Sequence, residues 1–358
     1  MGEPPMKSLA AVLQQPQVMR LQEFQIAPLR PDEVLLKVEQ VAVCGSDLPR
    51  YTGESTRLHL PIILGHEIVG HVAELGEQAT AYGVAPGDRV VVEPYLTCGR
   101  CRYCLRGRYQ LCEQNRCYGV TLTSDQPPYL LGGYSEYMVL IPGSRLHKID
   151  GAVPAGAASL ASVVANGLRW VQTRGRIQIG ETVVIMGCGA QALASVLAAR
   201  EGGAGLIIVM GLARDIPRFA MARQFGAQEI VNVDEEPPVE AVHRLTAGLL
   251  ADLAIECSGA PAAITAAIDI LRPGGRLVQI GTNATTVPIT TNLIVRKELQ
   301  IIGGLGQTFE VGTAVKLLNS CRYPIEALTM QVFPLAEAEQ AIRYALEHPQ
   351  CIRVGLKP

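Results

Sequence analysis

The chain has 358 residues, more than a single domain usually contains, and 48% of them are hydrophobic. Its formal net charge of −2 at pH 7 excludes a large basic surface of the kind that binds nucleic acid. No apolar run approaches the length of a membrane-spanning helix, and the N-terminal segment MGEPPMKSLAAVLQQPQ lacks the apolar core of a secretory signal. We therefore expect a soluble, cytoplasmic α/β protein of two domains, without nucleic-acid or membrane partners.

Residues 7–43 alternate short apolar runs with turns. The segments KSLAAVLQQP and DEVLLKVEQVAV repeat apolar residues with a period of two, and the runs are interrupted at Pro16, Pro28 and Pro31. This pattern is typical of antiparallel strands. The chain is therefore predicted to begin with a β-rich domain.

Two segments after this region carry side chains that zinc accepts. Cys44 opens the sequence CGSD, and Gly65-His66-Glu67 follows at the end of a short apolar run. A lone histidine is more often a hydrogen-bonded core residue than a ligand, but here a thiol, an imidazole and a carboxylate occur together. The two segments therefore predict a metal site at Cys44, His66 and Glu67.

Four cysteines within fifteen residues form the densest motif of the chain: Cys98, Cys101, Cys104 and Cys112. The spacing C-x2-C-x2-C-x7-C suits four thiolates around one tetrahedral zinc ion, and neighbouring arginines favour the thiolate form. Two disulfides are the alternative, but nothing in the sequence indicates secretion. The motif predicts a structural zinc site, closed to substrate.

From about residue 155 the β pattern gives way to Ala-rich segments with helical periodicity. Strand-like and helix-like segments then alternate, in the order ETVVIMG, QALASVLAAREGG, GLIIVMG, IPRFAMARQFG, LADLAIECSG, PAAITAAIDIL and GGRLVQIG. This alternation predicts a doubly wound parallel sheet.

A glycine-rich loop follows the first of these strands and opens the first helix. Its sequence is Gly187-Cys188-Gly189-Ala190-Gln191-Ala192, with alanine at the third position of G-x-G-x-x-G. An ordinary strand-to-helix turn is the alternative interpretation. The position of the motif between a strand and a helix favours a loop whose backbone N–H groups bind the pyrophosphate of a dinucleotide.

The second strand lacks the carboxylate that binds the ribose 2′-hydroxyl of NAD. The strand ends in Gly211, and the loop that follows contains Arg214, Asp215 and Arg218. Either arginine could pair with the 2′-phosphate of NADP. Because Asp215 lies in the same loop, both NADP and NAD remain open.

These segments, in this order, resemble the zinc-dependent medium-chain dehydrogenase/reductase family. The resemblance extends from about residue 8 to the C-terminus, and its most specific parts are Gly65-His66-Glu67, the four-cysteine motif and the glycine loop. It implies a GroES-like β-barrel catalytic domain with an inserted Rossmann domain. The expected ranges are 1–157 for the catalytic domain, with a zinc lobe at about 95–115, then 158–297 for the nucleotide-binding domain and 298–358 for the return to the catalytic domain.

The resemblance also implies an activity, namely hydride transfer between a nicotinamide cofactor and a small secondary alcohol, polyol or aminocyclitol, or the matching ketone. Cys44, His66 and Glu67 would hold a catalytic zinc, and Ser46 would accept the substrate proton. Ile280 and Gly281 would line the nicotinamide, and Arg353 would reach the pyrophosphate. A homodimer or homotetramer is expected.

The chain departs from the family pattern at two positions. Ser162 stands where the third zinc ligand is expected, and Pro49 stands where the family has a relay histidine. A neutral serine hydroxyl is a poor zinc ligand. One alternative is therefore a metal-independent NADPH reductase, or other non-alcohol chemistry on the same fold. A further alternative is a non-enzymatic NADPH-binding protein.

Overall fold

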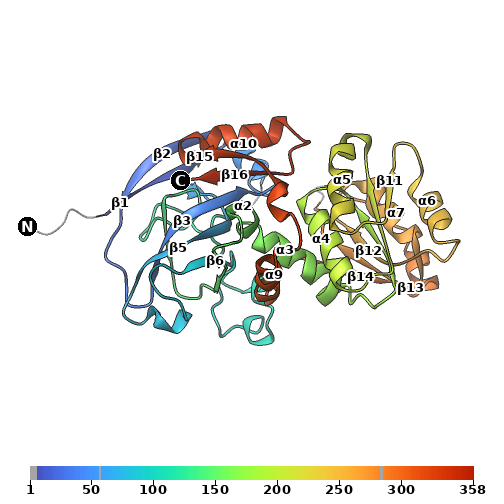
Figure 1. The fold of residues 1–358 in the computed structure, drawn as a ribbon, viewed down its shortest axis with the longest axis horizontal. Helices are drawn as coiled ribbons and strands as arrows, with labels where there is room; N and C mark the ends of the chain where they lie inside the picture. The colour runs from blue at the N-terminus through green and yellow to red at the C-terminus, as the bar shows by residue number, and fades with distance from the viewer. Residues whose placement is uncertain (1–5, 56–57, 283–284) are drawn as a thin grey trace, which may run out of the picture. The chain divides into compact units, whose positions relative to one another are not determined.

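The computed structural model describes residues 6–55, 58–282 and 285–358 of the protein. The chain forms two compact units, which Figure 1 shows as a ribbon. Unit 1 comprises Met1–Ser162 and Val311–Pro358, and unit 2 comprises Val163–Glu310. Unit 2 is therefore an insertion in the sequence of unit 1, as the sequence predicted.

Unit 1 is built mainly from β-strands, as the period-two pattern of its N-terminal segment predicted. One sheet has the strand order β2-β1-β4, and a larger sheet has the order β15-β16-β3-β5-β6-β8, with β7 paired to β3. The strands are β1 (Lys7–Gln15), β2 (Val18–Gln25), β3 (Val34–Val43), β4 (Ile62–Ile63), β5 (Glu67–Leu75), β6 (Arg89–Val92), β7 (Tyr137–Leu140), β8 (Leu146–Lys148), β15 (Thr329–Pro334) and β16 (Arg353–Lys357).

Short helices connect the strands of unit 1, and helix α10 packs against β15 and β16 (Figure 1). The helical segments are α1 (Leu48–Thr52), η1 (Ala79–Tyr82), η2 (Cys104–Arg106), η3 (Tyr109–Leu111), α2 (Ala155–Ala158), α9 (Glu310–Asn319), η6 (Ile325–Leu328), η7 (Leu335–Glu337) and α10 (Ala338–Glu347). Leu13, Leu36 and Tyr134 are completely buried in the core that these elements enclose. Burial of each such side chain contributes about 1.5–3 kcal/mol.

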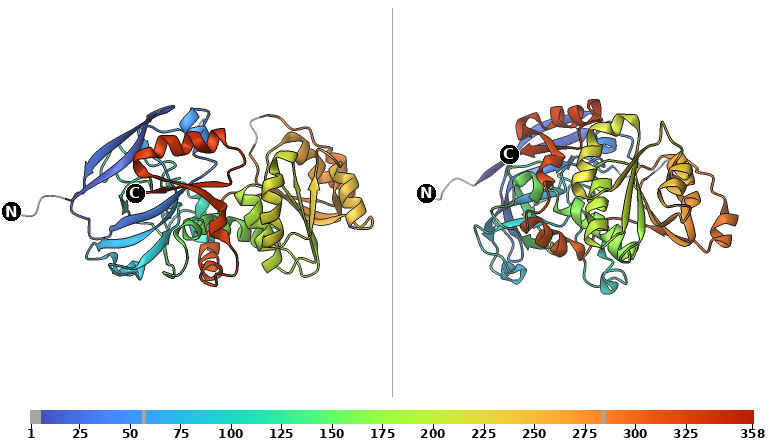
Figure 2. Two further views of the ribbon diagram at one scale, coloured as in Figure 1. Left: turned by 45° about the horizontal axis from the view of Figure 1, so that its top comes forward. Right: turned by 45° about the vertical axis from the view of Figure 1, so that its right-hand side comes forward.

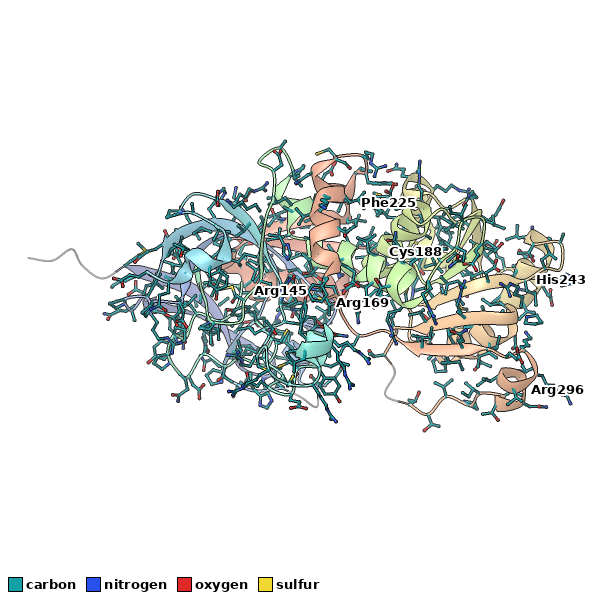
Figure 3. All side chains as sticks on the ribbon, turned by 90° about the horizontal axis from the view of Figure 1, so that it is seen from below. Arg145, Arg169, Cys188, Phe225, His243 and Arg296 are labelled. Carbon is teal, nitrogen blue, oxygen red and sulfur yellow. The ribbon has the colours of Figure 1, made fainter. Side chains whose placement is uncertain are left out.

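A buried carboxylate attaches the cysteine-rich segment to the sheet of unit 1. Glu93, directly after β6, is completely buried. It accepts hydrogen bonds from the Tyr109 hydroxyl (2.5 Å) and from His147 Nε2 (2.7 Å). Arg145, labelled in Figure 3, donates to the same carboxylate at 3.2 Å and lies over the Tyr109 ring. These contacts hold η3, which is part of the cysteine-rich segment, against β6 and β8.

Unit 2 contains the doubly wound parallel sheet that the sequence predicted. Its six strands have the order β11-β10-β9-β12-β13-β14, and every pair is parallel. The chain leaves β9, moves outward to β11, then crosses back to β12 beside β9, so the two halves of the sheet meet between β9 and β12. The strands are β9 (Thr182–Met186), β10 (Leu206–Gly211), β11 (Glu229–Asn232), β12 (Ala251–Glu256), β13 (Leu271–Gln279) and β14 (Gln300–Gly303).

The helices of unit 2 cover both faces of this sheet, with α4 and α5 packed together on one face and α6, α7 and α8 on the other (Figure 2). They are α3 (Ala161–Leu168), which begins in unit 1, the π-helical segment η4 (Arg169–Arg174), α4 (Ala190–Glu201), η5 (Ala213–Asp215), α5 (Ile216–Phe225), α6 (Pro238–Leu245), α7 (Pro261–Asp269) and α8 (Thr291–Arg296).

The boundary expected at residue 298 differs from the structure. Gln300–Gly303 forms β14, which pairs with β13 and is the last strand of the unit 2 sheet. The chain therefore returns to unit 1 only after Glu310. The apolar residues of β14 complete a parallel sheet, and the sequence pattern alone did not distinguish this role from the first strand of the returning segment. At the other boundary, unit 1 extends to Ser162 rather than to residue 157.

Within the residues that the structure describes, no helix has the length and apolarity needed to cross a bilayer.

Candidate active site

Three strand ends in unit 1 bring the predicted metal ligands together. Cys44 follows the last residue of β3, and His66 precedes the first residue of β5, which is Glu67. β3 and β5 are antiparallel with Ala42 opposite Glu67, so the end of one strand lies beside the start of the other. β16 pairs with β3 on its other side, with Val354 opposite Val43, which brings the start of β16 to the same place.

The ligand atoms of this cluster are of the types that zinc binds. The Cys44 sulfur, a ring nitrogen of His66 and a carboxylate oxygen of Glu67 all lie within 4.8 Å of one another. Zinc binds such atoms at about 2.0–2.3 Å, so ligation of one ion by all three requires them to be no more than about 4.5 Å apart, which small side-chain movements can provide. Gly65 is required before His66 because its φ is +93° and a Cβ there would lie 2.5 Å from the Tyr134 ring.

Asp47 supports two of these ligands, a role that the sequence analysis missed. Its carboxylate is completely buried and accepts hydrogen bonds from the Cys44 N–H (2.9 Å) and the Tyr134 hydroxyl (3.2 Å). Its other oxygen lies 3.4 Å from His66 Nδ1. Burial alone would raise the pKa of the Asp47 carboxyl, but the charge of His66 together with Arg50 and the Cys44 N–H holds that pKa below its usual value. An acidic residue three positions after a candidate cysteine ligand was the available sequence signal.

Glu67 and Arg353 form a buried ion pair. Glu67 is 2% exposed and Arg353 is 9% exposed. Arg353 Nε and Nη2 each lie 3.3 Å from a different oxygen of the Glu67 carboxylate. The partner that the structure gives Arg353 is therefore a carboxylate of the metal cluster, and the predicted contact of Arg353 with a pyrophosphate remains a prediction.

Three further predicted positions belong to unit 1. Ser46 Oγ lies 3.4 Å from His66 Nε2, so the hydroxyl faces the ring nitrogen that does not face Asp47. Pro49 occupies the first turn of α1 and offers no side-chain proton acceptor. Ser162 is 6% exposed in the first turn of α3.

The four cysteines of the predicted structural site lie close together. Their sulfurs all fall within 4.8 Å of one another. Cys98 and Cys104 are 3.8 Å apart at sulfur, which matches the separation of about 3.8 Å between two ligands of a tetrahedral zinc with Zn–S bonds of about 2.3 Å. Backbone N–H groups of Glu113 and Cys104 lower the pKa of the Cys101 thiol to about 6, which favours the thiolate that zinc requires. With Cys112 as the fourth donor, the set fits one structural zinc.

The glycine loop in unit 2 has the geometry of a dinucleotide-binding turn. Gly187 has φ of +113°, and its N–H is bonded to the Met210 carbonyl. Gly189 is the N-cap of α4, and a Cβ there would meet no atom within 4 Å, so a ligand can approach its backbone. The N–H groups of Ala190 and Gln191 belong to the first turn of α4. Cys188, labelled in Figure 3, and Ala192 are buried, so their side chains pack inside unit 2.

Packing of α5 crowds the position of Gly211. A Cβ at Gly211 would lie 2.8 Å from the Phe219 ring, so aspartate or glutamate here would require that ring to move. Asp215 is buried, accepts a hydrogen bond from the Leu212 N–H (3.1 Å) and pairs with Arg218 (3.1 Å). The charge of Arg218 is thus balanced within the loop, whereas Arg214 is exposed.

A buried glutamate joins the strand ends near Ile280 and Gly281. Glu256, the last residue of β12, is completely buried and accepts bonds from the Ser258 N–H (2.8 Å) and from Gln279 Nε2 (2.7 Å). A Cβ at Gly281 would lie 2.5 Å from a Glu256 oxygen, so only glycine fits there. The sequence analysis placed Ile280 and Gly281 at a strand end but gave Glu256 no role.

Two family models match the chain. The model of the alcohol dehydrogenase GroES-like domain matches residues 30–151, and the model of the zinc-binding dehydrogenases matches residues 192–320. A Mycobacterium tuberculosis protein named "Probable alcohol dehydrogenase adh" is 35% identical over 343 residues, which cover 93% of each chain. An erythritol/L-threitol dehydrogenase from Mycolicibacterium smegmatis is 30% identical over 99% of this chain and 98% of its own.

Solved structures match over the whole chain. An alcohol dehydrogenase from Thermotoga maritima has a TM-score of 0.90 with 28% identity, covering 99% of this chain and 100% of its own. A Sinorhizobium meliloti protein assigned to the zinc-binding dehydrogenases and bound to NADP has a TM-score of 0.87 with 26% identity, covering 99% of this chain and 100% of its own. The predicted combination of a GroES-like domain with an inserted Rossmann-like domain is confirmed.

Proposed function

Because the chain belongs to the zinc-type alcohol dehydrogenase family, we propose that it transfers hydride between a nicotinamide cofactor and a small secondary alcohol, polyol or aminocyclitol, or the matching ketone. That the protein is an oxidoreductase follows from the family itself. The observation that carries the finer proposal is the cluster of Cys44, His66 and Glu67 at converging strand ends.

Asp47 and Ser46, which surround this cluster, have parts in the proposed reaction. Bound zinc would act as a Lewis acid toward the substrate hydroxyl, and the nicotinamide would accept the hydride. Asp47 faces His66 Nδ1 and so leaves Nε2 for the metal. Ser46 Oγ is placed to accept the proton of the substrate hydroxyl. Pro49 cannot carry the proton further, so the proton would pass from Ser46 to water.

Glu67 has two competing partners. Its carboxylate belongs to the metal cluster, yet both of its oxygens face Arg353 at 3.3 Å. Cys44 and His66 would therefore be the permanent ligands, and Glu67 would bind the metal in exchange with Arg353. Ser162 adds no thiolate, so we expect weaker zinc binding here than at the four-cysteine site.

For the cofactor we propose binding of the pyrophosphate at Gly189 and the first turn of α4, with a preference for NADP. Gly211 lacks the carboxylate that would repel a 2′-phosphate, and Arg214 is exposed in the loop that follows. Ile280 and Gly281 would line the nicotinamide. An Arg214→Gln variant should raise the KM for NADPH and leave the KM for NADH unchanged. Equal changes for both cofactors would count against this assignment.

Metal analysis together with a substrate panel tests the proposed function. Zinc-loaded protein should contain two zinc ions per chain by plasma mass spectrometry and should oxidise members of a panel of secondary alcohols and polyols with NADP or NAD. One zinc per chain would remove the catalytic metal from the proposal. Two zinc ions with no hydride transfer across the panel, in either direction and with either cofactor, would refute the activity.

A second candidate, a metal-independent NADPH reductase on the same fold, is favoured by Ser162 and Pro49. A Cys44→Ala variant distinguishes the two, because the zinc mechanism loses activity and the metal-independent one keeps it. We also propose a homodimer or homotetramer, as is expected of the family, which light scattering on the purified protein would test.

A further inference from the structure

Arg50 lies beside the metal cluster and has no part in the mechanism described above. It belongs to α1, and its Nη1 donates a hydrogen bond to the backbone carbonyl of Ser46, the residue whose hydroxyl faces His66. Its Nε is buried and has no hydrogen-bond partner among the described residues. A guanidinium with an unsatisfied N–H is costly to bury, so an additional acceptor near the head of Arg50 would be favourable.

The position of Arg50 is fixed by its neighbour Tyr51. Tyr51 is 2% exposed, and its hydroxyl donates to Glu339 (2.9 Å) and accepts from Arg343 Nε (3.0 Å), both on α10. The backbone carbonyl of Tyr51 also accepts the Gln17 N–H at 2.7 Å. Since α1 is anchored on two sides, Arg50 projects from a rigid turn, which is what a specific recognition residue requires.

Arg50 is close enough to the cluster to act on its charges. Its Nη1 donates to the carbonyl of Ser46, whose hydroxyl lies 3.4 Å from His66 Nε2. The next residue, Asp47, accepts the Cys44 N–H (2.9 Å) and faces His66 Nδ1 (3.4 Å). The guanidinium is therefore part of the surroundings of the metal site.

The charges around the cluster do not balance once zinc is bound. The negative groups are the Cys44 thiolate, Asp47 and Glu67, and the positive groups are Arg353, Arg50 and a divalent ion. One positive charge is left over. Where a site in a partly buried position carries excess positive charge and a guanidinium with a free donor, a planar or tetrahedral anion is the complementary ligand.

We propose that Arg50 recognises an anionic group on the substrate, so that the preferred substrate is a hydroxylated phosphate monoester or carboxylate rather than a neutral alcohol. The inference rests on the proposed dehydrogenase function and narrows its substrate class. Phosphate and carboxylate offer the same oxygen acceptors to a guanidinium, and the experiment distinguishes them.

The test uses the zinc-loaded full chain and matched substrate sets of three to six carbons, each containing a polyol, its phosphate monoester and its aldonate. The anionic member should have a kcat/KM about 10- to 100-fold above that of the neutral polyol, the range expected for one charged hydrogen bond. A preference for the phosphate over the aldonate, or the reverse, identifies the anion. Equal kcat/KM for neutral and anionic members would overturn the proposal.

Arg50→Gln separates recognition from a structural role, because glutamine keeps a polar side chain with a donor and loses the charge. The variant should raise the KM for the anionic substrate about 10-fold or more and leave kcat/KM for the neutral polyol within about twofold of the parent. Arg50→Lys should recover part of the loss. Equal losses on both substrates would show a structural role only and would overturn the proposal.

Arg20→Gln is the matched control, since Arg20 is exposed on β2 and the change in net charge is the same. It should leave both KM values unchanged. Direct binding of inorganic phosphate by calorimetry gives a readout besides turnover, and it should weaken in Arg50→Gln and not in Arg20→Gln. Turnover of the anionic substrates with a KM that Arg50→Gln leaves unchanged would refute this inference alone, whereas no turnover of any member with either cofactor would refute the dehydrogenase function.

Discussion

Replacing Arg353 by methionine should destabilise unit 1 strongly. The change leaves Glu67 with an unpaired charge in a position that is 2% exposed, after losing two contacts of 3.3 Å. Methionine has roughly the volume of the arginine stem, so the cavity contribution is small and the unpaired charge dominates. Removing one partner of a buried ion pair costs about 3–5 kcal/mol, and we expect this range for Arg353→Met without added zinc.

The assay must report on unit 1, because the single tryptophan of the chain, Trp170, belongs to unit 2. Hydrogen exchange of the β3, β5 and β16 amides gives the free energy of opening for unit 1, and Trp170 fluorescence during urea unfolding serves as the internal control. The double variant Arg353→Met/Glu67→Gln should recover most of the loss, since it removes the unpaired charge. Added zinc should also recover part of it if Glu67 can bind the metal.

A loss below about 1 kcal/mol in Arg353→Met would refute this reasoning, because it would mean that Glu67 is protonated or hydrated at no cost. A full loss without recovery in the double variant would show that Arg353 stabilises unit 1 by packing rather than by its charge.

Three other outcomes are expected. Asp47→Asn should weaken zinc binding at the Cys44 site by about 10- to 100-fold, because His66 loses the carboxylate that orients it. A competition titration with a chromophoric chelator measures this affinity, and an unchanged affinity would contradict the role of Asp47. Cys104→Ser should lower the zinc content by one ion per chain in plasma mass spectrometry, and a content equal to that of the parent would exclude the four-cysteine site. Burial alone would raise the pKa of Glu310, but bonds from Thr308 and the charge of Arg169 (labelled in Figure 3) hold it below its usual 4.5. This interaction stabilises unit 2 above that pH and is lost as the pH falls below it. Urea unfolding followed by Trp170 fluorescence should therefore show a decrease in the free energy of unfolding on acidification, and this decrease should be smaller in Arg169→Met. An identical pH dependence in both proteins would contradict this assignment.

Two motifs of closely spaced residues have an arrangement that local spacing already fixes. The four cysteines lie within fifteen residues, so any compact turn brings their sulfurs together, and the glycine loop lies between one strand and the helix that follows it. The alternation of apolar segments predicted the parallel sheet of unit 2, because strand and helix patterns differ in period. The boundary at residue 298 was wrong because β14 has the same apolar pattern whichever sheet it joins.

Contacts between side chains that are distant in sequence were known only from the tertiary structure. Arg353 is 286 residues from Glu67, and only the pairing of β16 with β3 brings them together. The sequence showed glycine at position 211 where a carboxylate is usual, but the Phe219 ring that crowds this position is known only from the packing of α5. The sequence by itself determined the family, the two kinds of domain and the candidate ligands Cys44, His66 and Glu67. The tertiary structure decided which charges surround those ligands, since the positions of Asp47, Arg50 and Arg353 depend on strand pairing and buried contacts that no local spacing encodes.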